Sequence, residues 1–457
     1  MLDLTRQTAD FVARLKPADL PDRCKEAARV GIIDCVGVMI AGAAEQPVRI
    51  VAAMLSASTQ NDGVPEIPSG RNLVASDAAL VNGVAAHVLD YDDVALAGHP
   101  SAVLVPAILA EGWSLDRSGS DAVAAYAAGY EVWAQVAALE PGHLHERGFH
   151  PTAVMGALAS AAACARLRRL DPEKSAHAIA ISASLASGLV ANFGTMTKSL
   201  HAGRTAQSGV LAARLAAQGF TASLDVLEHR TGFLRAHSPS GAPRLDDAVI
   251  DIGTHWRLSE IGVNVKRYPT CYATHRSIDA MLDLVGVHKL RPDDVEEIRV
   301  NTGAMQKLML RNANPKTGLE AKFSMEFAMA SALIAGRVGL GELTDEFVLR
   351  PEVSATFAKV RCTTTDDVMD GKEPFAPTDQ VSVVLASGEV LRHEPVIHPK
   401  GSWQQPLSRE ELQDKFTDCA TRVLSRSHAA SLFAQLWDIE ELGSLRELRV
   451  TADRADA

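Results

Sequence analysis

Hydrophobic residues recur every three to four positions along most of the chain, a spacing that places them on one face of an α-helix. This pattern predicts helices over residues 22–42, 78–90, 101–113, 120–136 and 205–218. Two further stretches, 153–167 and 173–190, are rich in Ala, Gly and Ser. Small side chains let helices approach closely, so we expect these two to be central helices that are buried against one another.

The pattern changes after Gly262 and returns to helical spacing near Ser408. Between these points, strands are predicted over residues 295–300, 357–362, 380–385 and 389–392, the last two forming a hairpin. Helices are predicted there over residues 276–287 and 323–334.

We therefore predict a mainly α-helical fold in three segments. Residues 1–264 form a large all-helical domain, and residues 265–400 form a smaller α+β domain. Residues 401–457 are a C-terminal helical segment that packs on the helical domain.

Composition limits the possible partners and compartment. The net charge of −11 over 457 residues argues against binding to nucleic acid or to an anionic membrane, although it leaves an anionic substrate open. No apolar run is long enough to span a membrane, and the N-terminus lacks the pattern of a signal peptide. The six cysteines are widely spaced, which disfavours a zinc site, an iron–sulfur cluster or a disulfide framework and favours the cytoplasm.

Residues 82–101 concentrate groups that can carry chemistry. Ser76 or Asp77 is a suitable N-cap for a helix that carries His87 and Asp90 on one face. Three acids, at positions 90, 92 and 93, follow at the expected helix C-terminus, where the helix dipole favours cations instead. A capped helix–loop–helix with solvated acids explains the same pattern without a functional role.

A second unusual stretch spans residues 192–204. Lys198, His201 and Arg204 precede or begin the helix expected over 205–218. Backbone N–H groups at a helix N-terminus and nearby cationic side chains make such a place suitable for an anion. A surface loop with ordinary basic residues is the alternative interpretation.

These segments together resemble the MmgE/PrpD family over nearly the whole chain. The matching pieces, in the family's order, are Asn82-Gly with His87, Asp90, Asp92 and Asp93; His99-Pro-Ser; Arg147-Gly-Phe-His150-Pro-Thr; Lys198 with His201-Ala-Gly; Lys266 with Tyr268-Pro, Cys271 and Thr274-His275; and Ala321-Lys-Phe-Ser. Six segments in one order are far more specific than any one of them.

The resemblance implies a large helical domain and a smaller α+β lid, with the active site between them, and usually a homodimer. It also implies that a small di- or tricarboxylate is the substrate and that no metal or organic cofactor takes part. The catalytic residues it implies are Lys198, His150, Asp90, His99 and His275.

The family reactions share the removal of a proton from a carbon beside a carboxylate, which requires a base and stabilisation of an enolate-like charge. We expect Lys198 to be the base, because a lysine in a closed pocket loses hydration, and His150 or His145 to be the acid. Asp90 is expected to orient a histidine, while His99 and His275 donate to the substrate.

Four residues are expected to bind substrate carboxylates: His145, Arg204, Lys266 and His201. We interpret His87 as a structural histidine.

Three positions depart from the family pattern. Val94 and His145 stand where the family often has Thr and Tyr, and Glu326-Phe327 replaces a common Pro-Tyr. These departures remove hydroxyl groups and argue against 2-methylcitrate and cis-aconitate as substrates.

The expected function is that of a cofactor-independent lyase, similar to 2-methylcitrate dehydratase. An isomerase similar to iminodisuccinate epimerase is the main alternative, because it needs nearly the same residues. A decarboxylase of the cis-aconitate type and a non-catalytic carboxylate-binding protein are further alternatives.

Overall fold

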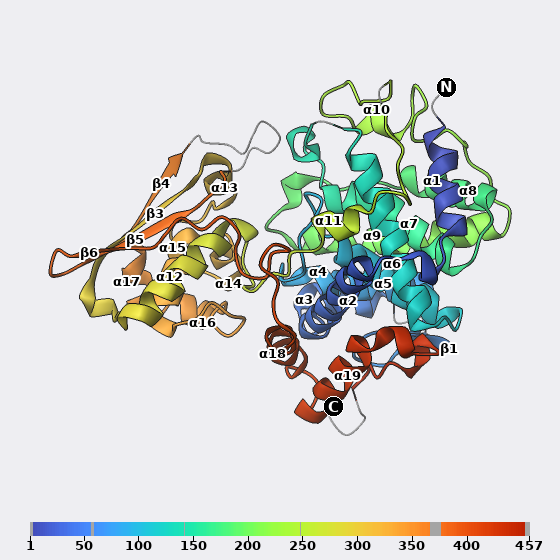
Figure 1. Ribbon diagram of the computed structural model, residues 1–457. Helices are drawn as coiled ribbons and strands as arrows, with labels where there is room; N and C mark the ends of the chain where they lie inside the picture. The colour runs from blue at the N-terminus through green and yellow to red at the C-terminus, as the bar shows by residue number, and fades with distance from the viewer. Residues whose placement is uncertain (1–2, 56–58, 141, 247, 366–375, 453–457) are drawn as a thin grey trace. The chain divides into compact units, whose positions relative to one another are not determined.

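The computed structural model describes residues 3–55, 59–140, 142–246, 248–365 and 376–452. The chain forms two compact units. The first contains Met1–Asn264 and Ser408–Ala457, and the second contains Val265–Leu407. The predicted fold class, mainly α with a smaller α+β part, is confirmed (Figure 1).

The first unit is helical apart from two short antiparallel strands, β1 (Thr59–Pro65) and β2 (Asn72–Leu73), which the sequence did not indicate. Its helices are α1 (Leu4–Arg14), α2 (Asp22–Gly42), α3 (Gln46–Met54), α4 (Ala75–Val88), α5 (Pro100–Ser114), α6 (Gly119–Ala137), α7 (Pro151–Leu167), α8 (Pro172–Ala183), α9 (Met196–Ala217), α10 (Phe233–His237), α11 (Arg257–Ile261), α18 (Arg409–Ala420) and α19 (Arg426–Trp437).

The centre of this unit is formed by α4, α5, α7 and α9. Helix α4 packs along α9, and α7 packs against α5, α6 and α9. Every residue of α7 is buried, as its small and apolar composition predicts. Helix α8 ends at Ala183 rather than near residue 190, and residues Val190–Asn192 form a separate short 3₁₀ turn.

Helices α4 and α9 approach most closely at two glycines. A Cβ added to Gly83 would lie 2.6 Å from the Cα of Gly203, and one added to Gly203 would lie 2.3 Å from the carbonyl oxygen of Leu80. No larger residue fits at either position without moving backbone. The crossing therefore fixes how α9, which carries Lys198 and His201, lies against α4, which carries His87 and leads to Asp90.

Both ends of α4 differ from the prediction. The helix begins at Ala75, with Val74 at the N-cap position and no side-chain cap, so the expected capping role of Ser76 or Asp77 is wrong. The two residues lie in its first turn. The helix ends at Val88.

The C-terminal segment belongs to the first unit. Helices α18 and α19, drawn in red in Figure 1, pack against α2 and against each other. A capping box at Ser408 and Glu411 begins α18, since each side chain accepts from the other residue's backbone N–H. Residues more than 300 positions apart in the sequence are thereby brought together.

The second unit contains a four-stranded sheet in the order β4-β3-β5-β6, with β3 parallel to β4 and antiparallel to β5. Its elements are α12 (His275–His288), β3 (Val295–Gly303), α13 (Ala304–Met309), α14 (Gly318–Ala321), α15 (Met325–Ala335), α16 (Asp345–Val348), α17 (Pro351–Phe357), β4 (Val360–Thr365), β5 (Gln380–Leu385) and β6 (Val390–Arg392).

The predicted hairpin is present as β5 and β6. The strand predicted from residue 357 begins only at Val360, because Pro351 starts α17 and this helix runs to Phe357. Helices α12 and α15 pack against each other, and their buried faces form one apolar core with the inner residues of the sheet.

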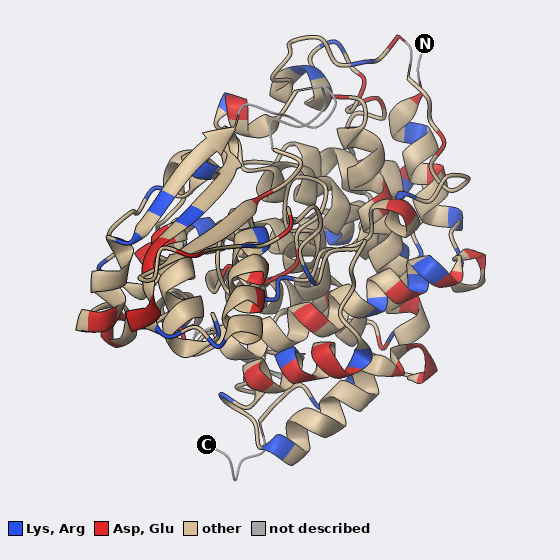
Figure 2. Cartoon of the chain, turned by 60° about the vertical axis from the view of Figure 1, so that its left-hand side comes forward, with Lys and Arg blue, Asp and Glu red and all other residues tan. Residues whose placement is uncertain are grey.

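Among the described residues, no single helix is long and apolar enough to cross a membrane. The sharply bent pair of α2 and α3 reaches the length and apolar composition of a membrane span only when the two helices are taken together. In the view of Figure 2, basic and acidic residues are interspersed over the surface, and acidic ones are the more numerous in the sequence, with 56 against 45.

Candidate active site

The loop that follows α4 separates its three acids. The helix ends at Val88, so the acids at positions 90, 92 and 93 lie outside it. The prediction that His87 and Asp90 share a helical face is therefore wrong. Asp90 adopts φ 52°, a left-handed conformation that is uncommon for residues other than glycine. This turn sends the side chains of Asp90 and Asp92 to different partners.

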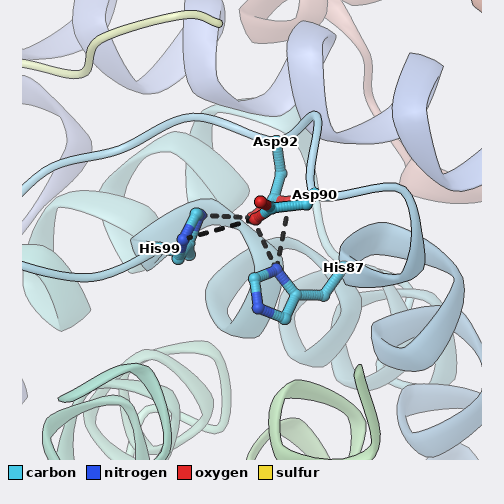
Figure 3. A group of neighbouring side chains, drawn as sticks. All are labelled: His87, Asp90, Asp92 and His99. Atoms are coloured by element: carbon cyan, nitrogen blue, oxygen red, sulfur yellow. Dashed lines mark hydrogen bonds and ion pairs between the residues drawn. The ribbon is translucent and has the colours of Figure 1, made fainter. Parts of the chain in front are cut away.

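Asp92 binds two imidazole rings. Its carboxylate oxygens lie 3.0 and 3.1 Å from Nδ1 of His87, and Oδ2 lies 2.9 Å from Nδ1 of His99 (Figure 3). Nδ1 of His99 also lies 3.0 Å from the carbonyl oxygen of Asp93. With Asp92 ionised, both rings donate to it from Nδ1–H, which leaves Nε2 as the ring nitrogen that is not bonded to Asp92.

Burial sets the charges in this group. Burial lowers the pKa of His87 to about 4, so its ring is neutral at pH 7. Burial alone would raise the pKa of Asp92, but its interactions with His87 and His99 hold it well below its usual range. The pKa of Asp93 is raised well above its usual range, first by burial and then by the nearby Asp34 and Asp92 carboxyl groups. The pKa values of these two successive carboxyl groups are therefore shifted in opposite directions.

Asp90 forms an ion pair with Lys198. Nζ of Lys198 donates to Oδ1 of Asp90 at 2.8 Å, and the two side chains are only 12% and 9% exposed. Nε2 of His99 lies 3.9 Å from the same oxygen. Nζ of Lys198 also lies 5.2 Å from the centre of the Phe193 ring. The pair is thus an ammonium–carboxylate contact largely shielded from solvent. It lies beside His87, His99, His150 and His201, which we call the histidine group.

His150 also contacts the ring of Phe193. It precedes Pro151 at the start of α7, and its backbone N–H donates to the carbonyl of Gly188 at 3.0 Å. Its Nδ1 lies 3.1 Å from Nδ1 of His201, so one ring must donate and the other accept. Its ring centre lies 4.8 Å from that of Phe193 and 5.8 Å from that of His87.

Burial is also the main cause of the low pKa of His150, which lies well below its usual range, and of the lowered pKa of His201. For His150, the charges of His87 and Lys198 act in the same direction. Both rings are therefore neutral near pH 7.

Helix α9 begins earlier than predicted. It starts at Met196, after Thr195 caps its N-terminus, and not near residue 205. The helix start expected near residue 205 is therefore wrong. Lys198 lies in the first turn of α9, while His201 and Arg204 lie further along it, and anion binding there stays a prediction. Lys198 faces the histidine group, to which His201 belongs, whereas Arg204 is exposed and donates to the side chain of Gln207 at 2.7 Å.

His145 is exposed on a 3₁₀ turn, Leu144–Arg147, with its ring centre 6.2 Å from that of Phe193. His145 and His150 therefore both contact Phe193, and this aromatic ring joins two of the predicted residues to Lys198.

Two predicted residues belong to the second unit. His275 begins α12 and is fully buried, with Nε2 3.4 Å from the carbonyl oxygen of Thr270 and its ring centre 4.8 Å from that of Tyr272. Lys266 is 1% exposed. The expected proximity of His275 to Lys198 joins the two units and stays a prediction, as does substrate binding by Lys266.

The four residues in Figure 3, His87, Asp90, Asp92 and His99, also have the composition of a metal site. One ligand atom from each lies within 4.8 Å of all the others. The ammonium group of Lys198 is hydrogen-bonded to Asp90, however, and a cation there opposes a second one. Protons bridge Asp92 to both histidines at ordinary hydrogen-bond lengths, so we interpret this cluster as a proton-bridged network.

Three contributors to this arrangement were not predicted from the sequence. Asp92, rather than Asp90, lies within hydrogen-bond distance of two histidines, and His87 is one of them. Phe193 contacts Lys198, His145 and His150. The sequence shows that Asp90 and Asp92 are two positions apart. Only the backbone turn at Asp90 shows that Asp90 contacts Lys198 while Asp92 contacts the histidines.

The structure thus defines a class: a mainly helical protein whose helical unit buries a network of histidines, carboxylates and one lysine, followed along the chain by a smaller α+β unit. The sequence model of the MmgE/PrpD N-terminal domain matches residues 6–246, and that of the C-terminal domain matches residues 268–439. The chain belongs to the MmgE/PrpD family.

Curated relatives match over almost their full length. Cis-aconitate decarboxylase of Homo sapiens is 29% identical over 96% of this chain and 92% of the relative. The enzyme of the same name from Mus musculus is 29% identical, over 96% and 91%. Cis-aconitate decarboxylase of Aspergillus terreus is 23% identical, over 97% and 95%.

Proposed function

We propose that this protein is a cofactor-independent lyase that acts on a small polycarboxylate by removing a proton from a carbon next to a carboxylate. The proposal agrees with membership of the MmgE/PrpD family and with relatives whose printed names denote a lyase. The observation that carries it is the contact of one ammonium group and one neutral imidazole, Lys198 and His150, with the same aromatic ring.

The structure favours an exchange of the roles expected for Lys198 and His150. A hydrogen bond from Lys198 to Asp90 stabilises the ammonium form, which suits a cation that binds a carboxylate or the enolate-like charge. His150 has a pKa well below its usual range because it is buried, so its ring is unprotonated and able to accept a proton. In this proposal His150 is the base and Lys198 is the electrostatic and acid partner.

Asp92 and His99 complete the proposed mechanism. Asp92 holds the Nδ1–H of His99, which leaves Nε2 as the atom that exchanges a proton with a leaving group. This arrangement resembles other carboxylate–histidine pairs in which the carboxylate fixes the tautomer and orientation of the ring. His87 is bound to the same carboxylate and serves to hold it in place.

The substrate proposal draws on Val94, which follows Asp93 directly and whose backbone pairs with Asn264. Phe327, in contrast, is fully buried in the core of the second unit, with its ring centre 6.3 Å from that of Phe347, so it does not bear on the substrate. Because Val94 has no hydroxyl group, we propose a substrate with fewer polar contacts there than 2-methylcitrate or cis-aconitate requires.

An epimerase is the second candidate. Lys198 and His150 are two proton-carrying groups from different helices, and an epimerase needs one group to remove a proton and another to return it. Decarboxylation of a cis-aconitate-like acid remains a third candidate, because the matched relatives carry that name. We further propose that the protein is cytoplasmic and forms a homodimer. Sedimentation or light scattering tests the oligomeric state directly.

The proposal is tested with a panel of small di- and tricarboxylates, including hydroxy acids, unsaturated acids and amino- or imino-substituted ones, and with product detection by NMR. His150→Gln and Lys198→Met should each lower turnover roughly 10²–10⁴-fold, the usual scale for acid–base groups. The loss of turnover in the double variant should be smaller than the product of the two single losses, because His150 and Lys198 serve one reaction.

Two variants outside the cluster serve as controls. His229→Gln lies on a loop, where its ring contacts Thr231, and Lys174→Met lies on α8. Both should retain turnover within about 3-fold of the parent, as expected for side chains that touch no proposed site residue. Folded His150→Gln and Lys198→Met variants with parental activity would contradict the mechanism.

A further inference from the structure

Helix α18 places a buried lysine against the loop of the candidate active site. Lys415 is 8% exposed, although lysine is seldom buried unless it is paired. Its Nζ donates to the carbonyl oxygen of Tyr91 at 2.9 Å and lies 2.5 Å from Oδ1 of Asp34 on α2. Nζ also lies 4.0 Å from the centre of the Tyr91 ring.

Tyr91 occupies the position between the two acids that matter most in the proposed site. Asp90, on one side, binds Lys198, and Asp92, on the other, binds His87 and His99. The Tyr91 carbonyl belongs to the peptide group that joins Tyr91 to Asp92, and this group lies outside α4, so helical hydrogen bonds do not fix its direction. A cation that holds this carbonyl therefore limits rotation of the backbone on either side of that peptide group, and with it the direction of Asp92.

The titratable groups around Lys415 come from several elements. Asp34 and Cys35 belong to α2, Asp93 belongs to the loop, and Cys419 belongs to α18. Burial is the first cause that raises the pKa of both thiols, so they are neutral near pH 7. The carboxylate of Asp34 is thus the ion-pair partner of Lys415.

We propose that Lys415 is a positioning residue, whose ammonium group holds the Tyr91 carbonyl and thereby aims Asp92 at His87 and His99. This inference rests on the proposed function. It makes the C-terminal helix α18 part of the active-site framework, although no residue of that helix belongs to the histidine group. Lys415 acts through the loop and does not itself handle the substrate.

Two substitutions separate positioning from simple stabilisation. Lys415→Met and Asp34→Asn both abolish the buried ion pair, but only Lys415→Met also removes the donor to Tyr91. Leu412→Ala, a buried residue on the same helix, removes apolar packing and leaves both polar contacts. A role limited to stability predicts that these variants lose activity in proportion to stability.

The readout that needs no substrate is the NMR spectrum of the full chain with ¹⁵N-labelled histidine, in which His87 and His99 are assigned from their Gln variants. In the parent protein, both rings should show the tautomer with the proton at Nδ1, because Asp92 accepts from both. Lys415→Met should give mixed tautomers for at least one ring. Asp34→Asn and Leu412→Ala should keep the parental signals.

Turnover on whichever carboxylate the parent converts provides the second readout. Lys415→Met should lower kcat at least about 10-fold with KM changed less than about 3-fold, as expected when an interaction specific to the transition state is lost. Asp34→Asn should keep kcat within about 3-fold of the parent.

Each outcome decides between the alternatives. Parental tautomers in folded Lys415→Met, or altered tautomers in Asp34→Asn, would overturn the positioning role. If Lys415→Met does not fold, altered tautomers in Asp34→Asn still overturn the role, because positioning requires the parental signals there. If the parent converts no carboxylate, the proposed function fails, while the spectra continue to test the role of Lys415.

Discussion

Acidification should lower the free energy of unfolding because His87 binds a proton in the unfolded chain and not in the folded one, and a His87→Gln variant should lack that loss. Burial lowers the pKa of His87 from 6.5 to about 4 in the folded protein. Between these values the unfolded chain binds more protons than the folded one. The free energy of unfolding must therefore fall as the pH falls through this interval.

The size of the effect follows from the two pKa values. At pH 5 the unfolded imidazole is almost fully protonated and the folded one almost fully neutral, whereas at pH 7 both are mainly neutral. The difference between pH 7 and pH 5 amounts to about 2 kcal/mol of unfolding free energy. The lowered pKa of Asp92 changes the unfolding free energy only near and below pH 3.8, the pKa of the unfolded carboxyl group, so it does not contribute between pH 7 and pH 5.

The assay is urea unfolding of the parent and of His87→Gln at pH 7, 6 and 5, analysed with a common m-value. His150 and His201 also have lowered pKa values, but they are present in both proteins and cancel in the comparison. The parent should lose about 2 kcal/mol more than the variant between pH 7 and pH 5. Equal losses in the two proteins would refute the buried neutral state of His87.

Three further predictions follow from named contacts. Asp92→Asn leaves one of two imidazoles without its acceptor and should lower the unfolding free energy, measured in urea, by about 2–4 kcal/mol. Gly203→Ala pushes a Cβ against the backbone of α4 and should cost about 1–3 kcal/mol, while Gly286→Ala, with open space on α12, should cost nothing; equal unfolding midpoints would contradict the close crossing. Exhaustive dialysis against EDTA should leave turnover unchanged, and activity lost and then restored by a divalent ion would contradict the cofactor-free mechanism.

The helical parts of the fold were predictable because their apolar residues follow the helix period and their ends carry clear signals. Helices over 22–42, 101–113 and 120–136 appear within a few residues of the expected positions. The start of α9 was not predictable from composition, since Gly194 to Lys198 is rich in polar and small residues that are typical of loops. Thr195 instead caps the helix there through its side chain.

The partners within the site were less predictable than its members. The resemblance to the family supplied Asp90, His99, His150 and Lys198, all of which lie in the first unit. It did not show that Lys198 meets Asp90, because the pair is 108 residues apart and joins the loop after α4 to helix α9. Lys415 and Tyr91 are 324 residues apart, and no local pattern connects them.

The central claim is that the protein removes a proton beside a carboxylate without a metal or cofactor. Its most direct test is NMR of the metal-stripped protein with the carboxylate panel in heavy water, which follows the C–H signals next to each carboxylate. The account predicts that at least one acid exchanges that hydrogen for deuterium, or forms an unsaturated product, with the parent and not with His150→Gln. Conversion of an acid by the parent without any loss or exchange of that hydrogen would contradict it.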